Sequence, residues 1–302
     1  MASDELEFVD WLKRRCPPHR AGELGIGDDM GIVRCGSDRL LVSSDMLLDG
    51  VHFDSSRHAY PLIGRKALAC SLSDCAAMAV RPVAATVSVA LPRSLSSANT
   101  KALYEGLIAL AEQFDVFIAG GDTTRWEHPL AIDVAILAAP YSNAEPVTRS
   151  RARAGDRLFV TGPLGGSILG HHLSFTPRIH EARQVAEQLG DKVHAMIDIS
   201  DGLSLDLWRV CQASGVGAEL EETLLAEVVS EDARRLSGSD GRPALDHALS
   251  DGEDFELLLA VDEAAVTEEE PLFPIGRVVE QGFAIRSPSG SLSPLRPTGY
   301  VH

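Results

Sequence analysis

A stretch with two acids, Asp198-Ile-Ser-Asp-Gly-Leu203, follows an apolar segment in the second half of the chain. The spacing predicts a strand over 193–199 and a helix over 203–213, so the acids lie on the turn between them. Strands that feed helix N-termini often bind charged ligands there, because free N–H groups and the helix dipole meet. The same residue types also cap helices, so this stretch alone fits a cap as well as a site.

Acids beside small residues recur elsewhere in the sequence, and this accumulation favours a site. We expect Asp28 and Asp29 to follow a glycine turn, Asp45 to follow a strand over 39–43, and Asp122 to follow a strand over 116–119. Asp74 lies in a helix that begins at Pro61, within an apolar stretch. A buried carboxylate is costly without a partner, so Asp74 predicts a nearby cation or basic side chain.

The sequence has no comparable cluster of His or Cys residues beside these acids. A set of ligands made only of oxygen atoms selects hard cations such as Mg²⁺. The sequence has neither the twelve-residue EF-hand pattern nor a P-loop motif. Several Mg²⁺ ions with a nucleotide is therefore the preferred interpretation. The formal charge, 27 basic against 44 acidic residues or −17, argues against nucleic acid as a partner.

At 302 residues the chain predicts two domains, which we place at 1–145 and 146–302. The segment 141–155 is polar and basic and predicts a linker. Arg149 within it could contact a phosphate or be a solvated charge. We expect the acidic region 219–242 to be variable and 257–261 to form a buried strand.

Five scattered cysteines indicate neither a disulfide framework nor a zinc site. The N-terminus lacks the basic start and apolar run of a secretory signal. The longest uncharged run, 158–177, contains glycines and prolines that argue against a membrane helix. These features predict a cytoplasmic protein with no membrane association.

A set of motifs in a fixed order resembles one family. They are Gly25-Ile-Gly-Asp-Asp29, Ser43-Ser-Asp-Met-Leu-Leu-Asp-Gly-Val-His-Phe53, Gly64-Arg-Lys-Ala-Leu-Ala69 with Leu72-Ser-Asp-Cys-Ala-Ala-Met78, Gly120-Gly-Asp-Thr-Thr124, Ile197-Asp-Ile-Ser-Asp-Gly-Leu203 and Gly252-Glu-Asp-Phe-Glu-Leu257. Together they resemble the thiamine-monophosphate kinase family, in the aminoimidazole ribonucleotide synthetase-like superfamily. The resemblance implies an α/β (α+β) fold of two domains, and a homodimer whose N-terminal sheets pair in a barrel.

The resemblance also implies an activity and a set of site residues. The activity is ATP-dependent phosphorylation of thiamine monophosphate to thiamine diphosphate, by Mg²⁺-assisted in-line transfer, in thiamine diphosphate biosynthesis. The implied Mg²⁺ ligands are Asp28, Ser44, Asp45, Asp74, Asp122, Asp198 and Asp201, with Asp45 and Asp122 catalytic. The implied ATP contacts are Gly121, Asp122, Arg149 and Ser200, and those of thiamine monophosphate are His52, Glu253 and Tyr300.

No residue is assigned as general base, because the acceptor is itself a phosphate monoester whose second pKa is about 6. The sequence departs from the family pattern at Arg151, which leaves Arg149 or Arg151 as the ATP contact, and at Asp251, where the family usually has glycine. The Tyr300 assignment rests on the few residues before the chain ends at His302. Competing interpretations are a metal-dependent phosphohydrolase, a non-catalytic nucleotide or metal sensor, and a sister enzyme of the superfamily.

Overall fold

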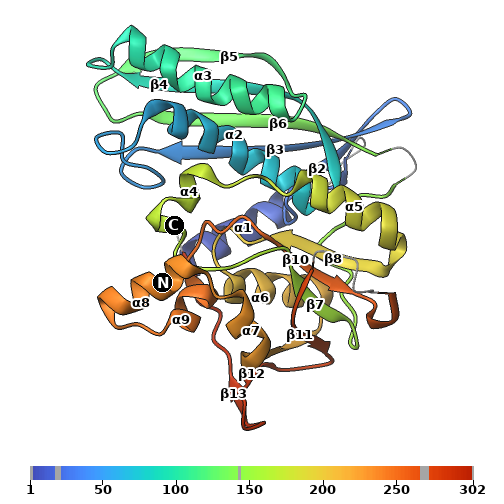
Figure 1. The fold of residues 1–302 in the computed structure, drawn as a ribbon. Helices are drawn as coiled ribbons and strands as arrows, with labels where there is room; N and C mark the ends of the chain where they lie inside the picture. Colours follow the sequence, from blue (N-terminus) through green and yellow to red (C-terminus); the bar gives the residue numbers. More distant parts are fainter. Residues whose placement is uncertain (1–2, 18–21, 142–143, 266–271, 301–302) are drawn as a thin grey trace.

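The computed structural model describes residues 3–17, 22–141, 144–265 and 272–300 (Figure 1). Its first half comprises α1 (Ser3–Arg15), β1 (Gly22–Leu24), β2 (Gly31–Cys35), β3 (Asp38–Leu48), α2 (Tyr60–Ala77), β4 (Val80–Pro92), α3 (Ser97–Gln113), β5 (Phe117–Trp126) and β6 (Ala131–Pro140). The strands form a six-stranded sheet in the order β1-β2-β3-β6-β4-β5, in which only β4 and β5 pair in parallel.

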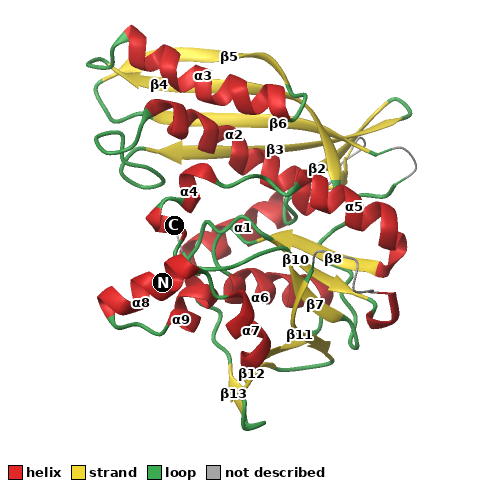
Figure 2. Ribbon diagram, viewed as in Figure 1, coloured by secondary structure: helices red, strands yellow, loops and turns green. Residues whose placement is uncertain are grey.

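The second half builds a separate seven-stranded sheet in the order β13-β12-β9-β11-β7-β10-β8. Its elements are β7 (Arg157–Val160), η1 (Ser167–Leu169), α4 (His171–Ser174), α5 (Ile179–Leu189), η2 (Gly190–Lys192), β8 (Val193–Asp198), α6 (Leu203–Ser214), β9 (Gly217–Glu221), α7 (Glu222–Val228), α8 (Glu231–Asp240), α9 (Ala244–Ser250), β10 (Leu257–Val261), η3 (Glu263–Ala265), β11 (Phe273–Val279), β12 (Phe283–Arg286) and β13 (Leu292–Pro294). Figure 2 shows both halves as mixed α/β layers, which confirms the predicted fold class.

Helix α2 lies between the two sheets (Figure 1). It packs on α3 and on strands β3, β4 and β6 of its own half, and also on α4, α5 and β8 of the other half. Pro61 at its first turn suits the start of a helix, because that position needs no N–H donor. Its side chains are apolar on nearly all sides, as expected for a helix packed on several surfaces.

One hydrophobic core runs through both halves. Leu68 and Leu72 of α2 belong to the same buried cluster as Phe159, Met196 and Leu259 of the second sheet. The opposite face of that sheet packs on α6 and α7 and forms a second cluster. The second sheet is thus buried on both faces, and a site at the junction rests on a continuous packed interior.

Two expectations about local structure were wrong. Asp45 and Asp122 lie inside the long strands β3 and β5 and not at strand ends. A strand can continue through polar residues when alternate side chains face the less buried side of the sheet. The polar residues in these two segments therefore did not mark the ends of the strands. The region 219–242 contains the end of β9 with α7 and α8. The division at 145/146 stays a prediction.

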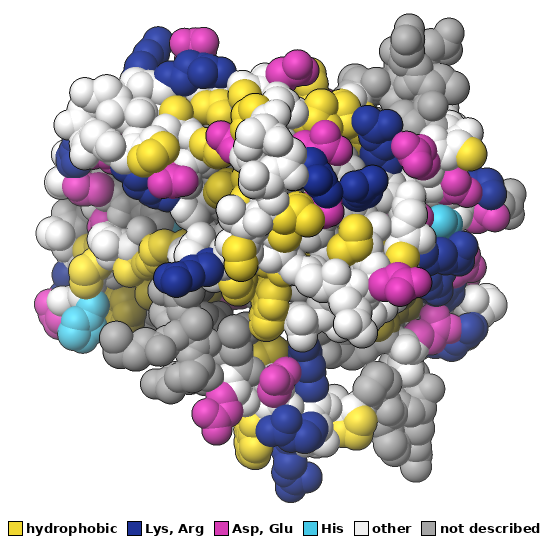
Figure 3. Space-filling model, turned by 90° about the horizontal axis from the view of Figure 1, so that it is seen from below, with side chains coloured by type: hydrophobic (Ala, Val, Ile, Leu, Met, Phe, Trp, Pro, Cys, Tyr) yellow, Lys and Arg dark blue, Asp and Glu magenta, His cyan; other side chains and the backbone are white. Residues whose placement is uncertain are grey.

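Two features concern the exterior of the protein: the mixture of side chains on its surface and the lengths of its described helices. The face in Figure 3 carries acidic and basic side chains interspersed with hydrophobic ones. Among the described helices, none combines the length and apolarity needed to cross a bilayer.

Helices α2 and α3 approach so closely that glycine is required on both. A Cβ on Gly64 would lie 1.9 Å from the Leu103 carbonyl oxygen, and one on Gly106 would lie 1.9 Å from that of Pro61. We predict that Gly64→Ala lowers the free energy of unfolding by about 1–3 kcal/mol or more, measured by urea denaturation. The matched control is Gly238→Ala in α8, where the new Cβ meets nothing within 4 Å. It should stabilise by about 0.5–1 kcal/mol, and equal effects of the two variants would contradict the close contact.

Candidate functional site

Carboxylates from three distant segments meet at the junction of the two halves. Asp29 comes from the turn before β2, Asp74 from the last turn of α2, and Asp198 from the end of β8. One oxygen from each of these side chains lies within 4.8 Å of the other two. The predicted gathering of acids therefore exists in the folded chain, with Asp29 as a member that the predicted ligand set did not include.

Donor groups beside the carboxylates fix their orientation. The Ser73 hydroxyl donates to Asp198 Oδ2 at 2.6 Å, and the Ser71 hydroxyl donates to Asp45 Oδ2 at 2.6 Å. Ser71 and Ser73 are two residues apart on α2, so this helix orients acids from both sheets. Such short bonds to carboxylates hold the oxygens in place before any ligand binds.

Arg149 lies at the same junction with its side chain 15% exposed, and it is not the solvated charge that we considered. Its Nη2 donates to Asp29 Oδ1 at 2.6 Å, and its backbone N–H donates to Asp28 Oδ2 at 3.3 Å. Arg151 is exposed. Of the two candidate arginines, Arg149 is therefore the one at the carboxylate cluster.

Burial and mutual repulsion raise the pKa values of these acids. Burial, followed by the charge of Asp29, raises the pKa of Asp28 to about 6. The pKa of Asp74 is raised well above its ordinary value by burial and then by Asp45 and Asp198. Burial, followed by the charge of Asp29, does the same to Asp198. In the absence of a cation the cluster thus resists full ionisation, and a bound cation would remove that resistance.

The donor set fits a hard divalent cation. Asp29 Oδ2 is buried and has no hydrogen-bond partner among the described residues. A buried unpaired carboxylate oxygen is costly, and a metal ion is one of the partners that removes this cost. The ligands are all oxygens, which Mg²⁺ prefers. Asp29, Asp74 and Asp198 are the residues that could hold it.

Two cavities meet at the cluster. The larger, of about 960 Å³, is lined by three predicted acceptor contacts, His52, Glu253 and Tyr300. The smaller, of about 610 Å³, is lined by the acids of the cluster and by Arg149. Both cavities share the residues Ser44, Asp45 and Ser200. Ligands in the two cavities would therefore approach each other beside Asp45.

The three predicted acceptor contacts come from separate segments. His52 Nδ1 accepts from the N–H of Leu48, which ties its ring to the end of β3. Glu253 lies in the loop before β10 and has a positive φ of 65°. Tyr300 is held by its N–H to the Asp201 carbonyl at 2.8 Å, and its side chain is 45% exposed.

Three predicted metal ligands make contacts with other residues or lie on another strand. The Ser44 hydroxyl donates to Asp133 Oδ1 at 2.8 Å, on the face of the sheet opposite Asp45. Asp122 lies on the edge strand β5, three strands from β3 and so about 14 Å away. Asp201 forms an ion pair with Arg209 at 2.5 Å. Among the described acids, Asp122 and Asp201 are not members of the group whose oxygens lie within 4.8 Å of one another.

Sequence reasoning also missed two groups behind the site. Lys66 is fully buried and forms an ion pair with Glu253 at 2.6 Å. Asp206 is fully buried, accepts from the N–H groups of Asp201 and Gly202, and forms an ion pair with Arg209. Burial raises the pKa of Asp206 to about 7. Lys66 and Asp206 are both charged residues within apolar helical stretches, and this pattern in the sequence could have identified them.

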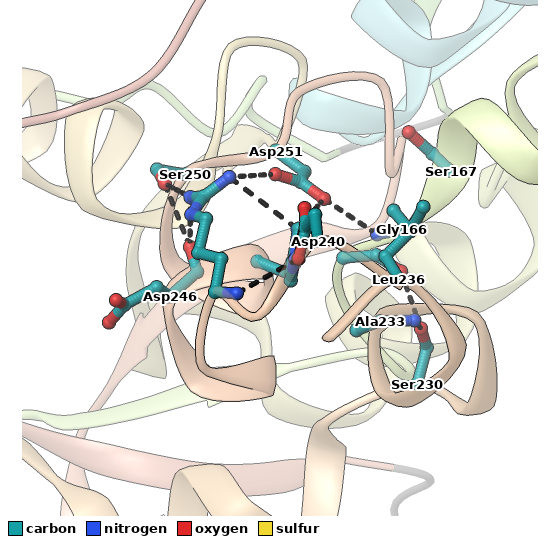
Figure 4. A network of polar contacts seen from close by, with 12 residues as sticks. Gly166, Ser167, Ser230, Ala233, Leu236, Asp240, Asp246, Ser250 and Asp251 are labelled. Carbon is teal, nitrogen blue, oxygen red and sulfur yellow. Dashed lines mark hydrogen bonds and ion pairs between the residues drawn. The ribbon is translucent and has the colours of Figure 1, made fainter. Parts of the chain in front are cut away.

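Asp251, the departure from the family pattern, is the centre of a polar network (Figure 4). Its carboxylate forms an ion pair with Arg242 at 2.9 Å, is hydrogen-bonded to His247 Nδ1 at 2.8 Å, and accepts from the N–H of Gly166 at 3.1 Å. Arg242 also donates to the hydroxyl of Ser250. Asp251 therefore ties the loop that carries Glu253 to α9 and to the turn before η1.

The fold and the site place the chain in a defined class. The AIR synthase related protein N-terminal domain matches residues 27–139, and the C-terminal domain of the same name matches residues 153–286. A thiamine-monophosphate kinase of Rhodopirellula baltica is 40% identical over 314 aligned residues, which cover 99% of this chain and 97% of the relative. That of Escherichia coli K12 is 34% identical, covering 80% of this chain and 77% of the relative. The chain belongs to the thiamine-monophosphate kinase family.

A solved structure shares the whole fold. AaThiL complexed with AMPPCP and TMP superposes with a TM-score of 0.85 at 27% identity, and the match covers 99% of this chain and 97% of that one. The likeness extends through both sheets and the junction between them, because it covers nearly the whole of both chains.

Asp74 tests the cation site. Asp74→Asn removes a buried like charge but keeps the shape, so without metal the variant should be at least as stable as the parent. We predict that its affinity for Mg²⁺ falls at least about tenfold, measured by isothermal titration calorimetry and by the Mg²⁺-dependent rise in Tm. Asp246→Asn, at an exposed position of α9, is the control. An unchanged Mg²⁺ affinity in Asp74→Asn would argue against this cluster as the metal site.

Asp251 tests the network at the cavity wall. Asp251→Asn removes the carboxylate that pairs with Arg242 and is hydrogen-bonded to His247, so we predict a loss of about 1–3 kcal/mol in the free energy of unfolding. Urea denaturation measures it, again with Asp246→Asn as the control. A loss no larger than that of the control would show that the network contributes nothing to stability.

Proposed function

We propose that this protein transfers the γ-phosphoryl group of ATP to thiamine monophosphate and so forms thiamine diphosphate. The observation that carries the proposal is the meeting of two cavities at Asp45, one lined by the predicted acceptor contacts and one by the acids and Arg149. Family membership supports it, since a curated relative named thiamine-monophosphate kinase aligns over 99% of this chain. The complex of AaThiL with AMPPCP and TMP supports the same pair of ligands.

In this proposal ATP occupies the smaller cavity. Arg149 contacts its phosphates, and Ser200 lies where the two cavities meet. Thiamine monophosphate occupies the larger cavity with His52 and Glu253, and the Tyr300 ring stacks on its cationic heterocycle. Its phosphate then lies at the shared wall, beside Asp45.

Mg²⁺ ions are the proposed cofactor, held by Asp28, Asp29, Asp45, Asp74 and Asp198. When bound, Mg²⁺ would neutralise the facing phosphates and help to align them. The protein's own contribution is to hold the carboxylates in fixed positions through Ser71 and Ser73 and to orient the nucleotide through Arg149. No general base is needed, because the acceptor phosphate is largely dianionic near neutral pH.

We further propose that the protein is a cytoplasmic homodimer that associates through the outer face and edge of the first sheet. Val42, Met46 and Leu48 alternate along β3 on the face away from α2 and are 37–61% exposed, and Phe117 at the start of β5 is 69% exposed. Apolar side chains gathered on one exposed sheet face are typical of an interface. Ser44 and Asp122 lie on this same face. In the dimer, Gly121 and Asp122 of one protomer would therefore lie at the interface and contact the nucleotide and metal in the site of the other protomer.

The activity itself is tested with purified protein, Mg²⁺-ATP and thiamine monophosphate. We expect thiamine diphosphate and ADP in equal amounts, with free thiamine a poor acceptor. We predict that Asp45→Asn lowers kcat by about 100-fold or more while leaving thermal unfolding nearly unchanged, because it removes charge at the point of transfer. Phosphate release without thiamine diphosphate would instead indicate a hydrolase, and binding without turnover would indicate a sensor.

Mixing two inactive variants tests the dimer proposal. If Asp122 acts across the interface, heterodimers of Asp45→Asn and Asp122→Asn regain one intact site of two. Random exchange of protomers should then restore roughly a quarter of the parent activity. Light scattering measures the oligomeric state in parallel. A monomeric enzyme with full activity would refute this arrangement.

A further inference from the structure

Lys66 is a buried charged residue that the proposed reaction does not use. Its side chain on α2 has no exposed surface. Its Nζ donates to the His52 carbonyl oxygen at 2.5 Å and to Glu253 Oε1 at 2.6 Å. A buried ammonium group is costly unless it is paired and hydrogen-bonded, so both contacts are needed to keep Lys66 inside the protein.

The two partners of Lys66 belong to different halves of the molecule. His52 lies in the loop after β3 of the first sheet, and Glu253 lies in the loop before β10 of the second. Both line the larger cavity, in which we place the acceptor. The buried ammonium group of Lys66 therefore links the two loops that form two walls of that cavity.

The backbone at Glu253 needs such support. Its φ of 65° is uncommon for a residue with a side chain and persists where surrounding contacts enforce it. Its N–H donates to the Ser200 carbonyl at 2.7 Å, and the ion pair to Lys66 fixes the other end of the residue. The side chain remains 27% exposed, so the held carboxylate is still accessible to a ligand.

We propose that Lys66 is a positioning residue for the acceptor substrate, acting through Glu253 and the His52 loop. The proposal rests on the proposed function, since it takes the larger cavity as the site of thiamine monophosphate. Lys66 holds the Glu253 carboxylate toward a cationic heterocycle and sets the distance between the two walls that enclose it. Its effect therefore falls on the acceptor and leaves ATP binding unchanged.

A purely structural ion pair between the two halves would behave differently. Its loss would lower thermal stability and would affect both substrates alike, or neither. A positioning role changes the affinity for one substrate only, and its effect becomes smaller when Glu253 is also replaced. The comparison of the two substrates therefore separates the two explanations.

The experiment compares Lys66→Met with Lys192→Met, which removes an exposed lysine paired with Asp262 at 3.6 Å. For Lys66→Met we expect kcat/KM for thiamine monophosphate to fall roughly 10- to 100-fold, with KM for ATP changed by less than about twofold. Lys192→Met should match the parent. Calorimetric titration with thiamine monophosphate, without ATP, should show the same loss of affinity for Lys66→Met.

A double-mutant cycle with Glu253→Gln completes the test. Because Lys66 acts in part through Glu253, the double variant should lose less affinity for thiamine monophosphate than the sum of the two single losses. Additive losses, equal losses for both substrates, or a lowered Tm with unchanged affinity would overturn the proposal. If Lys66→Met does not fold, Lys66→Arg keeps the charge but moves it, and the same split between substrates is expected.

The parent enzyme separates failure of this inference from failure of the proposed function. If the parent does not phosphorylate thiamine monophosphate and does not bind it, the proposed function fails. If the parent does both and the Lys66 variants behave like the parent, only the inference on Lys66 is overturned.

Discussion

Repulsion among carboxylates buried at one junction is the constraint on which the rest of this structure depends. Asp29, Asp74 and Asp198 come from a turn, a helix and a strand that are far apart in sequence, yet their oxygens lie within 4.8 Å. Such an arrangement opposes folding unless the surrounding packing holds it and cationic groups offset it. Arg149 offsets part of the charge, and the continuous core through both sheets supplies the packing.

Helix α2 is the element that satisfies this constraint. It carries Asp74 itself, the two serines that orient Asp45 and Asp198, and the lysine that pairs with Glu253. Its apolar remainder packs against both halves, so these polar groups have little freedom to move. The close backbone contact with α3 at Gly64 and Gly106 fixes the helix from its other side. Site geometry and core packing are therefore set by one helix.

Much of this could be predicted from the sequence, because it depends on local pattern. The strand and helix around Asp198 follow from periodicity, and the partly buried setting of Asp74 follows from its place in an apolar stretch. Asp29 was not assigned as a ligand and Lys66 was given no role, because their importance depends on Arg149 and Glu253, which lie 120 and 187 residues away. The placement of Asp122 could not be derived from pattern either, since strand order is a long-range property.

Strand β3 serves two surfaces at once. Asp45 points to the helix-covered side, where Ser71 binds it, and its neighbours Ser44 and Met46 point to the exposed side. Because side chains alternate along a strand, inserting or deleting a single residue upstream within β3 would exchange the two sets. The carboxylate would then face outward and the apolar side chains would face the acids. Length changes in this protein should therefore be tolerated in its loops and excluded from β3, whatever residues are involved.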